Sequence, residues 1–169
     1  MEKSKIKKIL YIILIMSWML VIFAFSNLQA TDSSEQSMTL SVNIVKGGAE
    51  FLHKIGIFKE MPSDEELDNA VEMIHNPIRK CAHAAEYFVL TFFIVVALRD
   101  KDCWNFSIKK AFLIAIGICF LYSLTDEFHQ IFIPGRSGEL TDCINDTLGG
   151  CVALVFYYIC HLIKSKIKK

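Results

Sequence analysis

Four long apolar runs constrain most tightly what this chain can fold into. They lie at about residues 9–26, 78–98, 111–133 and 144–163, and each is close to or above the roughly 18 apolar residues expected of a membrane-spanning helix. A soluble domain of 169 residues can bury a good core, but it does not produce four such runs bounded by lysine clusters. We therefore expect an all-α, integral membrane four-helix bundle, with residues 1–169 forming a single membrane domain.

Basic residues are concentrated at one set of helix ends. Twelve of the 18 lysines and arginines fall in three short segments, residues 3–8, 99–110 and 164–169. The positive-inside rule then predicts a multi-pass protein with both termini in the cytoplasm. The first run could also be a signal peptide, but Leu28 is unfavourable three places before a cut after Ala30, and the run is too long.

Residues 27–77, which join the first two runs, are expected to lie outside the cell and to form two amphipathic helices. The first helix carries an apolar stripe at helical spacing, made of Met38, Val42, Val45, Ala49 and Leu52. Gly47-Gly48 and Gly56 are expected to loosen or break it. The second helix starts at Ser63, with Glu66 completing a capping box. Both helices could lie flat on the outer leaflet or pack over the mouth of the bundle.

The third run contains charged residues where a lipid environment disfavours them. Asp126, Glu127, His129 and Gln130 lie near its end, and Glu127 is about 10 Å inside the boundary marked by Pro134. An ionisable residue at such a depth costs about 2.5–3.5 kcal/mol on insertion scales. These residues therefore need partners, and a functional site is the default interpretation.

Polar stripes also mark the outer ends of the second and fourth runs. Pro77 suits the first position of the second spanning helix, where its missing N–H is not needed. Arg79, His83 and Glu86 follow at spacings of four and three, so they share one helix face. The fourth run opens with a stripe that consists of Asp142, Asn145, Asp146 and Gly149. Lipid cannot accommodate these faces, so we expect them to meet inside the bundle around a common cavity.

Simpler interpretations exist for several of these residues. Asp142 could merely cap a helix, and Asn145 could hold two helices together. Tyr87 could be an interfacial aromatic residue. The basic side chains Arg79, Lys80 and Arg136 could extend to the membrane surface. The whole set could also be a structural polar network without chemistry.

The motifs resemble those of the VanZ-like family of bacterial membrane proteins. The similarity rests on three blocks, Arg79-Lys80-x-x-His83-x-x-Glu86-Tyr87, Asp126-Glu127-x-His129-Gln130-x-x-x-Pro134-Gly135-Arg136 and Asp142-x-x-x-Asp146-x-x-Gly149. Phe25-Ser26 and Gln29 also fit the pattern, whereas residues 59–68 show least similarity. The resemblance covers nearly the whole chain. It implies a bacterial cell-envelope protein, in a family named after a protein associated with resistance to the glycopeptide teicoplanin, and an association with membrane enzymes of lipid or polyprenyl head groups.

The charges and depth of these residues favour hydrolysis or group transfer at a phosphate-containing head group in the outer leaflet. A buried carboxylate or a histidine would serve as general base, and basic side chains would hold the phosphate. The candidate catalytic residues are His83, Glu86, Asp126, Glu127, His129 and Asp146. The candidate substrate-binding residues are Arg79, Lys80, Tyr87, Gln130, Arg136, Asp142 and Asn145. The expected partners are membrane lipids, including polyprenyl-phosphate-type lipids or cell-wall precursors, and not nucleic acid.

Two alternatives remain open at the level of sequence. The nitrogen and oxygen ligands of this set could hold zinc or manganese as a divalent metal cofactor. The protein could also be non-catalytic and bind a lipid, a cell-wall precursor or a drug, or it could be an ion- or proton-coupled transporter. Among the six cysteines no Cys-x-x-Cys spacing occurs, although Cys81 and Cys143 could pair near the outer helix ends.

Overall fold

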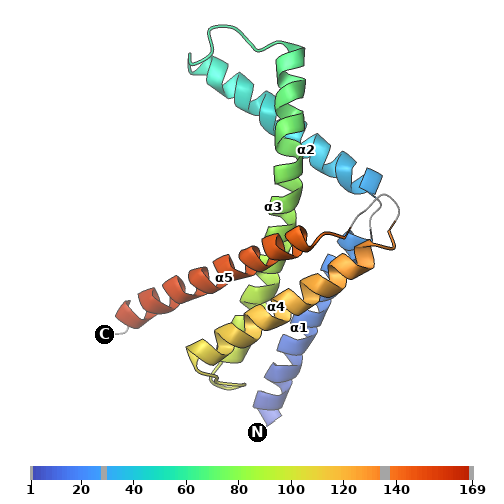
Figure 1. Ribbon diagram of the computed structural model, residues 1–169. Coiled ribbons are helices and arrows are strands. Elements are labelled where there is room, and N and C mark those ends of the chain that lie inside the picture. Colours follow the sequence, from blue (N-terminus) through green and yellow to red (C-terminus); the bar gives the residue numbers. More distant parts are fainter. Residues whose placement is uncertain (1, 28–29, 134–137, 168–169) are drawn as a thin grey trace.

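The computed structural model describes residues 2–27, 30–133 and 138–167, and within these ranges all regular structure is helical. The described helices are α1 (Glu2–Ser26), α2 (Ala30–Lys54), α3 (Asp64–Arg99), α4 (Ile108–Gln130) and α5 (Leu140–Ile167) (Figure 1). Four of them, α1, α3, α4 and α5, are long and apolar enough to cross a membrane. The expected all-α architecture with four candidate spans is therefore confirmed.

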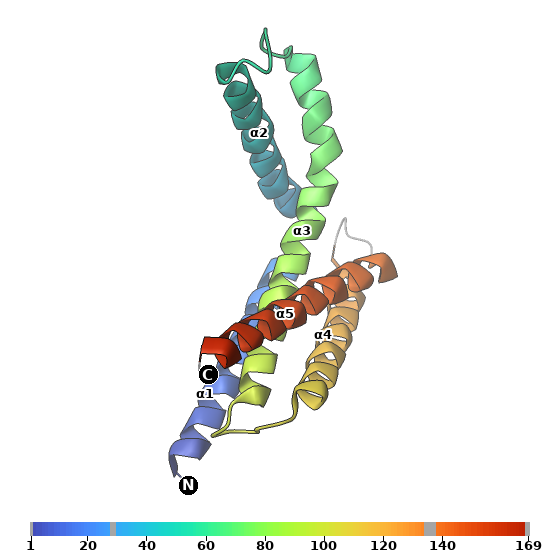
Figure 2. The ribbon, with the colours of Figure 1, turned by 90° about the vertical axis from the view of Figure 1, so that its left-hand side faces the viewer.

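Helix α3 is the central element, and it packs against each of the other four helices (Figures 1 and 2). Its buried residues Tyr87, Leu90 and Ile94 belong to one apolar core that also includes residues of α1, α4 and α5. Close helix packing is achieved with small residues, because buried alanines and glycines bring backbones together. These residues are Ala111 and Ala115 of α4 and Gly149, Gly150 and Ala153 of α5.

The outward faces of the spanning helices are apolar as well. In α1, only 11% of the most apolar window is buried inside the molecule. Leu10, Ile13 and Leu20 are among its exposed side chains. An apolar surface of this extent is suited to lipid rather than to water.

A helical hairpin made of α2 and the first half of α3 projects beyond the other helices (Figures 1 and 2). Helix α3 has 36 residues, which corresponds to about 54 Å and exceeds the roughly 30 Å hydrocarbon core of a bilayer. The predicted stripe faces α3 at Ala49, which is buried, as are Leu67 and Val71 on the opposing face. The hairpin therefore extends away from the bundle instead of closing over its mouth.

Two sequence expectations for this hairpin were wrong. Gly47 and Gly48 do not break the first outer helix, because α2 is continuous to Lys54 and its packing against α3 outweighs a cost of about 1 kcal/mol per glycine. Gly56, with φ of 79°, lies just beyond the helix end.

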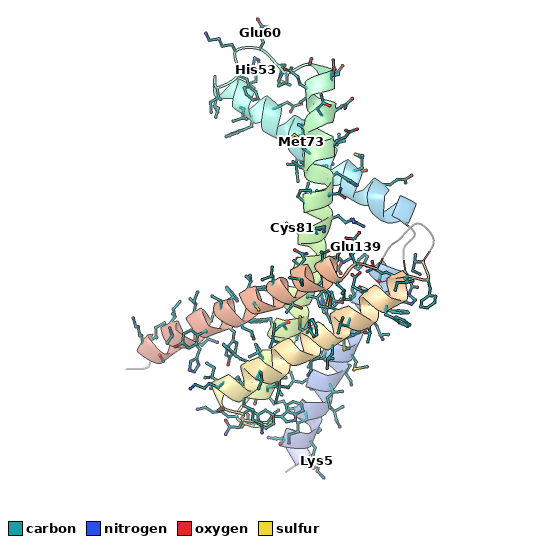
Figure 3. All side chains as sticks on the ribbon, viewed as in Figure 1. Lys5, His53, Glu60, Met73, Cys81 and Glu139 are labelled. Carbon is teal, nitrogen blue, oxygen red and sulfur yellow. The ribbon has the colours of Figure 1, made fainter. Side chains whose placement is uncertain are left out.

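The second outer helix starts at Ser63 with the predicted capping box, but it continues without interruption into the span. Pro77 consequently lies inside α3 rather than at a helix start. Pro77 cannot donate to the carbonyl of Met73, and Met73 lies on the projecting part of α3 with 78% of its surface exposed (Figure 3). Water can replace the missing hydrogen bond there.

The ends of α4 and α5 differ from the expected boundaries by a few residues. Helix α4 ends at Gln130, and residues 131–133 form a turn in which Phe132 N donates to His129 O at 3.0 Å. Helix α5 begins at Leu140, earlier than the expected residue 144. Helices α4 and α5 pack against each other, and they cross at an angle (Figure 2).

Candidate functional site

Six buried residues from three helices form a polar cluster near the α4–α5 connection. The polar cluster consists of Tyr87 of α3, Ser123, Asp126, Glu127 and Gln130 of α4, and Asp146 of α5. Its four α4 members recur at intervals of three, one and three residues, so they occupy one helix face. Because α4 packs against both α3 and α5, that face points into the bundle rather than into lipid.

Asp146 is the most deeply buried carboxylate of the polar cluster, with 1% of its surface exposed. Its Oδ2 accepts a hydrogen bond from Ser123 Oγ at 2.7 Å. Its Oδ1 is buried and has no hydrogen-bond partner among the described residues. Asp146 also interacts electrostatically with Glu127 and Asp126, so three carboxyl groups share one buried region.

Asp126 repeats this arrangement one helix away. Gln130 Nε2 donates to Asp126 Oδ2 at 3.2 Å, whereas the buried Oδ1 of Asp126 has no partner within the described part of the chain. The Tyr87 hydroxyl lies near Ser123, Asp126 and Asp146, and no described group completes a hydrogen bond with it. One oxygen each of Asp126 and Asp146 and the Tyr87 hydroxyl are therefore buried close together without a hydrogen-bond partner among the described residues, and each can bind a further group.

Glu127 connects the polar cluster to the molecular surface. Its Oε2 accepts a hydrogen bond from the backbone N–H of Glu139 at 2.8 Å, which joins α4 to the start of α5. A cavity of about 280 Å³ adjoins Glu127, and its other walls are mostly apolar. The cavity walls include Phe128, Ile131 and Leu140, whose side chains are exposed on the outer surface. A molecule that approaches from the lipid can therefore reach a carboxylate of the polar cluster.

An ion pair fastens α3 to α5 on the same side of the bundle. Lys80 Nζ lies 2.8 Å from Asp142 Oδ1, and Asn145 Nδ2 donates to the Lys80 carbonyl at 2.8 Å. The helices approach closely at Gly149, where a Cβ atom would collide with the backbone of Ala84. In this arrangement the predicted substrate-binding residues Lys80, Asp142 and Asn145 bind one another.

The two predicted histidines lie in separate places. His83 Nδ1 is 3.7 Å from Glu86 Oε2 on α3, and both side chains are partly exposed. His129 faces α1, where its Nε2 lies 2.9 Å from Asn27 Oδ1 and its ring packs on Phe23 with centroids 4.7 Å apart. His129 therefore leaves the face that carries Asp126 and Gln130.

The remaining predicted site residues can be placed briefly. Arg79 is half-buried on α3. Arg136 lies outside the described residues. Sequence reasoning missed Ser123, although it precedes Asp126 by three residues on the same helix face.

Neither a metal site nor a disulfide is present among the residues that the structure describes. The residues described contain no group of three His, Cys, Asp or Glu side chains arranged to hold a metal ion. Cys81 is exposed and Cys143 is buried, and both are free thiols. The open possibility of a disulfide between them is therefore not realised in the structure.

Comparison with known proteins assigns the chain to a family. A family model described as VanZ/LLP1 matches residues 10–161, which include α3 and α4 completely, most of α1 and α5, and every member of the polar cluster. No curated protein and no solved structure matches the chain. The family match and the four apolar helices together identify a membrane protein, and the chain belongs to the VanZ/LLP1 family.

Proposed function

We propose that the protein is a bacterial membrane enzyme that hydrolyses or transfers the head group of a phosphate-containing lipid, such as a polyprenyl phosphate. The observation that carries this proposal is the pair of buried carboxylates in the polar cluster. In both Asp126 and Asp146, one carboxylate oxygen accepts a hydrogen bond from an α4 side chain. The other oxygen has no hydrogen-bond partner among the described residues and lies near the Tyr87 hydroxyl. Such buried, convergent groups are the usual components of general acid–base chemistry.

The hydrogen bonds of the two carboxylates support the roles that we propose for them. Ser123 and Gln130 fix the orientation of Asp146 and Asp126, so the open oxygen of each points in a defined direction. An open carboxylate oxygen can accept the proton of an attacking water or alcohol. The Tyr87 hydroxyl makes no hydrogen bond to a described residue, so it can donate to a phosphate or leaving-group oxygen.

The lipid-facing cavity provides a route for the substrate. Its exposed apolar walls at Phe128, Ile131 and Leu140 suit a lipid tail that stays in hydrocarbon while the head group reaches Glu127. A cavity of about 280 Å³ holds a head group rather than a whole lipid. Arg136, four residues after Phe132 in the connection, is our candidate for phosphate recognition because arginine favours bidentate contacts.

We propose that this chemistry takes place in the outer leaflet. The clustered lysines at the opposite helix ends favour cytoplasmic termini, so the polar cluster would face outside the cell. This position agrees with the cell envelope and with the family's named association with teicoplanin resistance. We extend that association to this chain only as part of the proposal.

Comparative lipidomics tests the proposal without assuming a substrate. We would compare membranes that contain the intact chain, Asp126→Asn or Asp146→Asn with membranes that lack the protein. Asp68→Asn, at an exposed carboxylate of the projecting hairpin, is the control variant. We expect a lipid or polyprenyl species to change with the intact chain and the control but not with the two cluster variants, at equal protein levels. Identical profiles in all membranes would contradict an enzyme and leave binding of a lipid, cell-wall precursor or drug as the function.

A proton-coupled transporter is the second candidate. It is favoured by the burial of Asp126 and Asp146 without an ion pair to any described basic side chain, since such carboxylates can carry protons. Vesicles containing the purified chain and a pH-sensitive dye distinguish the two functions. Proton uptake that is lost in Asp126→Asn, together with unchanged lipid profiles, would favour transport.

A further inference from the structure

A second cavity lies at the opposite end of the bundle from the polar cluster. It has a volume of about 340 Å³ and is bounded by α1, by the last turns of α3 and by the C-terminal part of α5. None of its lining residues belongs to the polar cluster, so it is a separate site.

The rim of this cavity is cationic. Arg99 and Lys164 line it, and the buried Nε of Arg99 has no hydrogen-bond partner in the described chain. Arg99 Nη1 donates to the Phe106 carbonyl, which holds the guanidinium in place at the end of α3. No described acidic group forms an ion pair with Arg99 or Lys164.

The only carboxylate on the cavity wall, among the residues that the structure describes, is already occupied. Asp100 pairs with Lys7 Nζ at 2.8 Å and accepts a hydrogen bond from the Tyr11 hydroxyl at 2.8 Å. The backbone N–H of Asp102 also donates to Asp100, at 2.9 Å. Asp100 is therefore neutralised by other groups, and Arg99 and Lys164 keep positive charge for an external anion.

The inner wall of the cavity is apolar. Phe92, Val96 and Cys160 line it together with Tyr157, which stacks on His161 at 6.4 Å. Phe92 precedes Arg99 by seven residues, or about 10 Å along the helix towards the membrane centre. The cavity thus changes from cationic to apolar over the distance at which a phospholipid changes from head group to acyl chain.

We propose that this cavity binds the phosphate of an anionic phospholipid, with Arg99 and Lys164 at the phosphate and the acyl chain against Phe92 and Tyr157. Basic cavities between membrane helices on the cytoplasmic side suit anionic head groups, and the positive-inside rule assigns this end to the cytoplasm. A planar guanidinium with an open Nε is suited to phosphate, and a nearby ammonium adds charge. This site would bind an inner-leaflet lipid, independently of the chemistry proposed for the polar cluster.

Lipid binding to the detergent-purified full chain, counted by native mass spectrometry, tests this inference. Phosphatidylglycerol would be titrated against phosphatidylcholine as the neutral comparison. Lys164→Gln is the main variant, because Lys164 is exposed and its replacement leaves the fold intact. Lys166→Gln is the matched control, since Lys166 is exposed on the same helix end but does not line the cavity.

We expect Lys164→Gln to weaken phosphatidylglycerol binding about fivefold, the effect of about 1 kcal/mol per basic residue near a membrane surface, and Lys166→Gln to leave it nearly unchanged. Arg99→Gln should weaken it about tenfold, with helicity by circular dichroism confirming the fold. Equal effects of Lys164→Gln and Lys166→Gln, or equal binding of the neutral lipid, would overturn the proposal. Displacement of the lipid by excess inorganic phosphate would overturn it too, because free phosphate would then be the ligand.

Discussion

The close approach of α3 and α5 gives a prediction whose sign can be worked out from the structure. A Cβ atom at Gly149 would collide with the backbone oxygen, carbonyl carbon and Cα of Ala84. A backbone cannot rotate aside as a side chain can, so Gly149→Ala must push the two helices apart. Overpacking of this kind costs about 1–3 kcal/mol, and three backbone collisions place this site at the upper end.

The expected net effect includes the helix preference of alanine. Alanine favours a helix by about 1 kcal/mol over glycine, so Gly149→Ala should lower the free energy of unfolding by about 2 kcal/mol. Gly117→Ala in α4 is the matched control, because nothing lies within 4 Å of its added Cβ. That control should stabilise the protein by up to about 1 kcal/mol.

Reversible unfolding of the purified chain in mixed micelles, followed by circular dichroism, measures both variants. The two changes share the same chemistry, so any difference between them reports the contact with Ala84. The reasoning is refuted if Gly149→Ala proves as stable as the intact chain or matches Gly117→Ala.

Three further predictions use the same unfolding measurement. Ser63→Ala removes the capping box of α3 and should cost about 1 kcal/mol, whereas no loss would show that the cap is dispensable. Ser123→Ala leaves Asp146 Oδ2 without its donor in a buried place, so a loss of about 1–3 kcal/mol is expected, and a neutral result would mean that another group replaces the serine. The hydrogen bond from Lys7 holds the pKa of Asp100 below its usual range. The stabilising effect of the pair is therefore present above the unfolded pKa of about 4 and is lost as the pH falls through the lower folded value. At neutral pH the intact chain should have a free energy of unfolding up to about 1 kcal/mol higher than that of Asp100→Asn, and this difference should disappear in acid. A difference that grows in acid would contradict the pairing.

Local sequence patterns predicted four candidate spanning helices and the polar stripes on three of them. Apolar run length identified four spans, because a bilayer imposes a minimum helix length. The Ser63–Glu66 capping box was readable because all its partners lie within four residues. The polar faces of α4 and α5 were also visible, since residues three and four apart share a helix face wherever the helix lies.

Boundaries that depend on competing local costs were less predictable. Pro77 and the Gly47-Gly48 pair carry unfavourable helix energies, and sequence reasoning ended a helix at each. The structure continues both helices because α2 and α3 pack along each other and solvent can serve the carbonyl near Met73. Tertiary contacts outweighed local preference in both cases.

The sequence by itself indicated a membrane protein with four candidate spans and with acidic residues near one end of them, and the chain belongs to the VanZ/LLP1 family. Only the tertiary structure decided which polar residues meet. Asp126 and Asp146 share a cluster with Tyr87, whereas His129, only three residues after Asp126, faces Phe23 of α1. The physical reason is that sequence spacing sets only the relative angle of side chains on one helix. The rotation of each helix about its axis is set by contacts between helices, such as the close packing of Gly149 against Ala84.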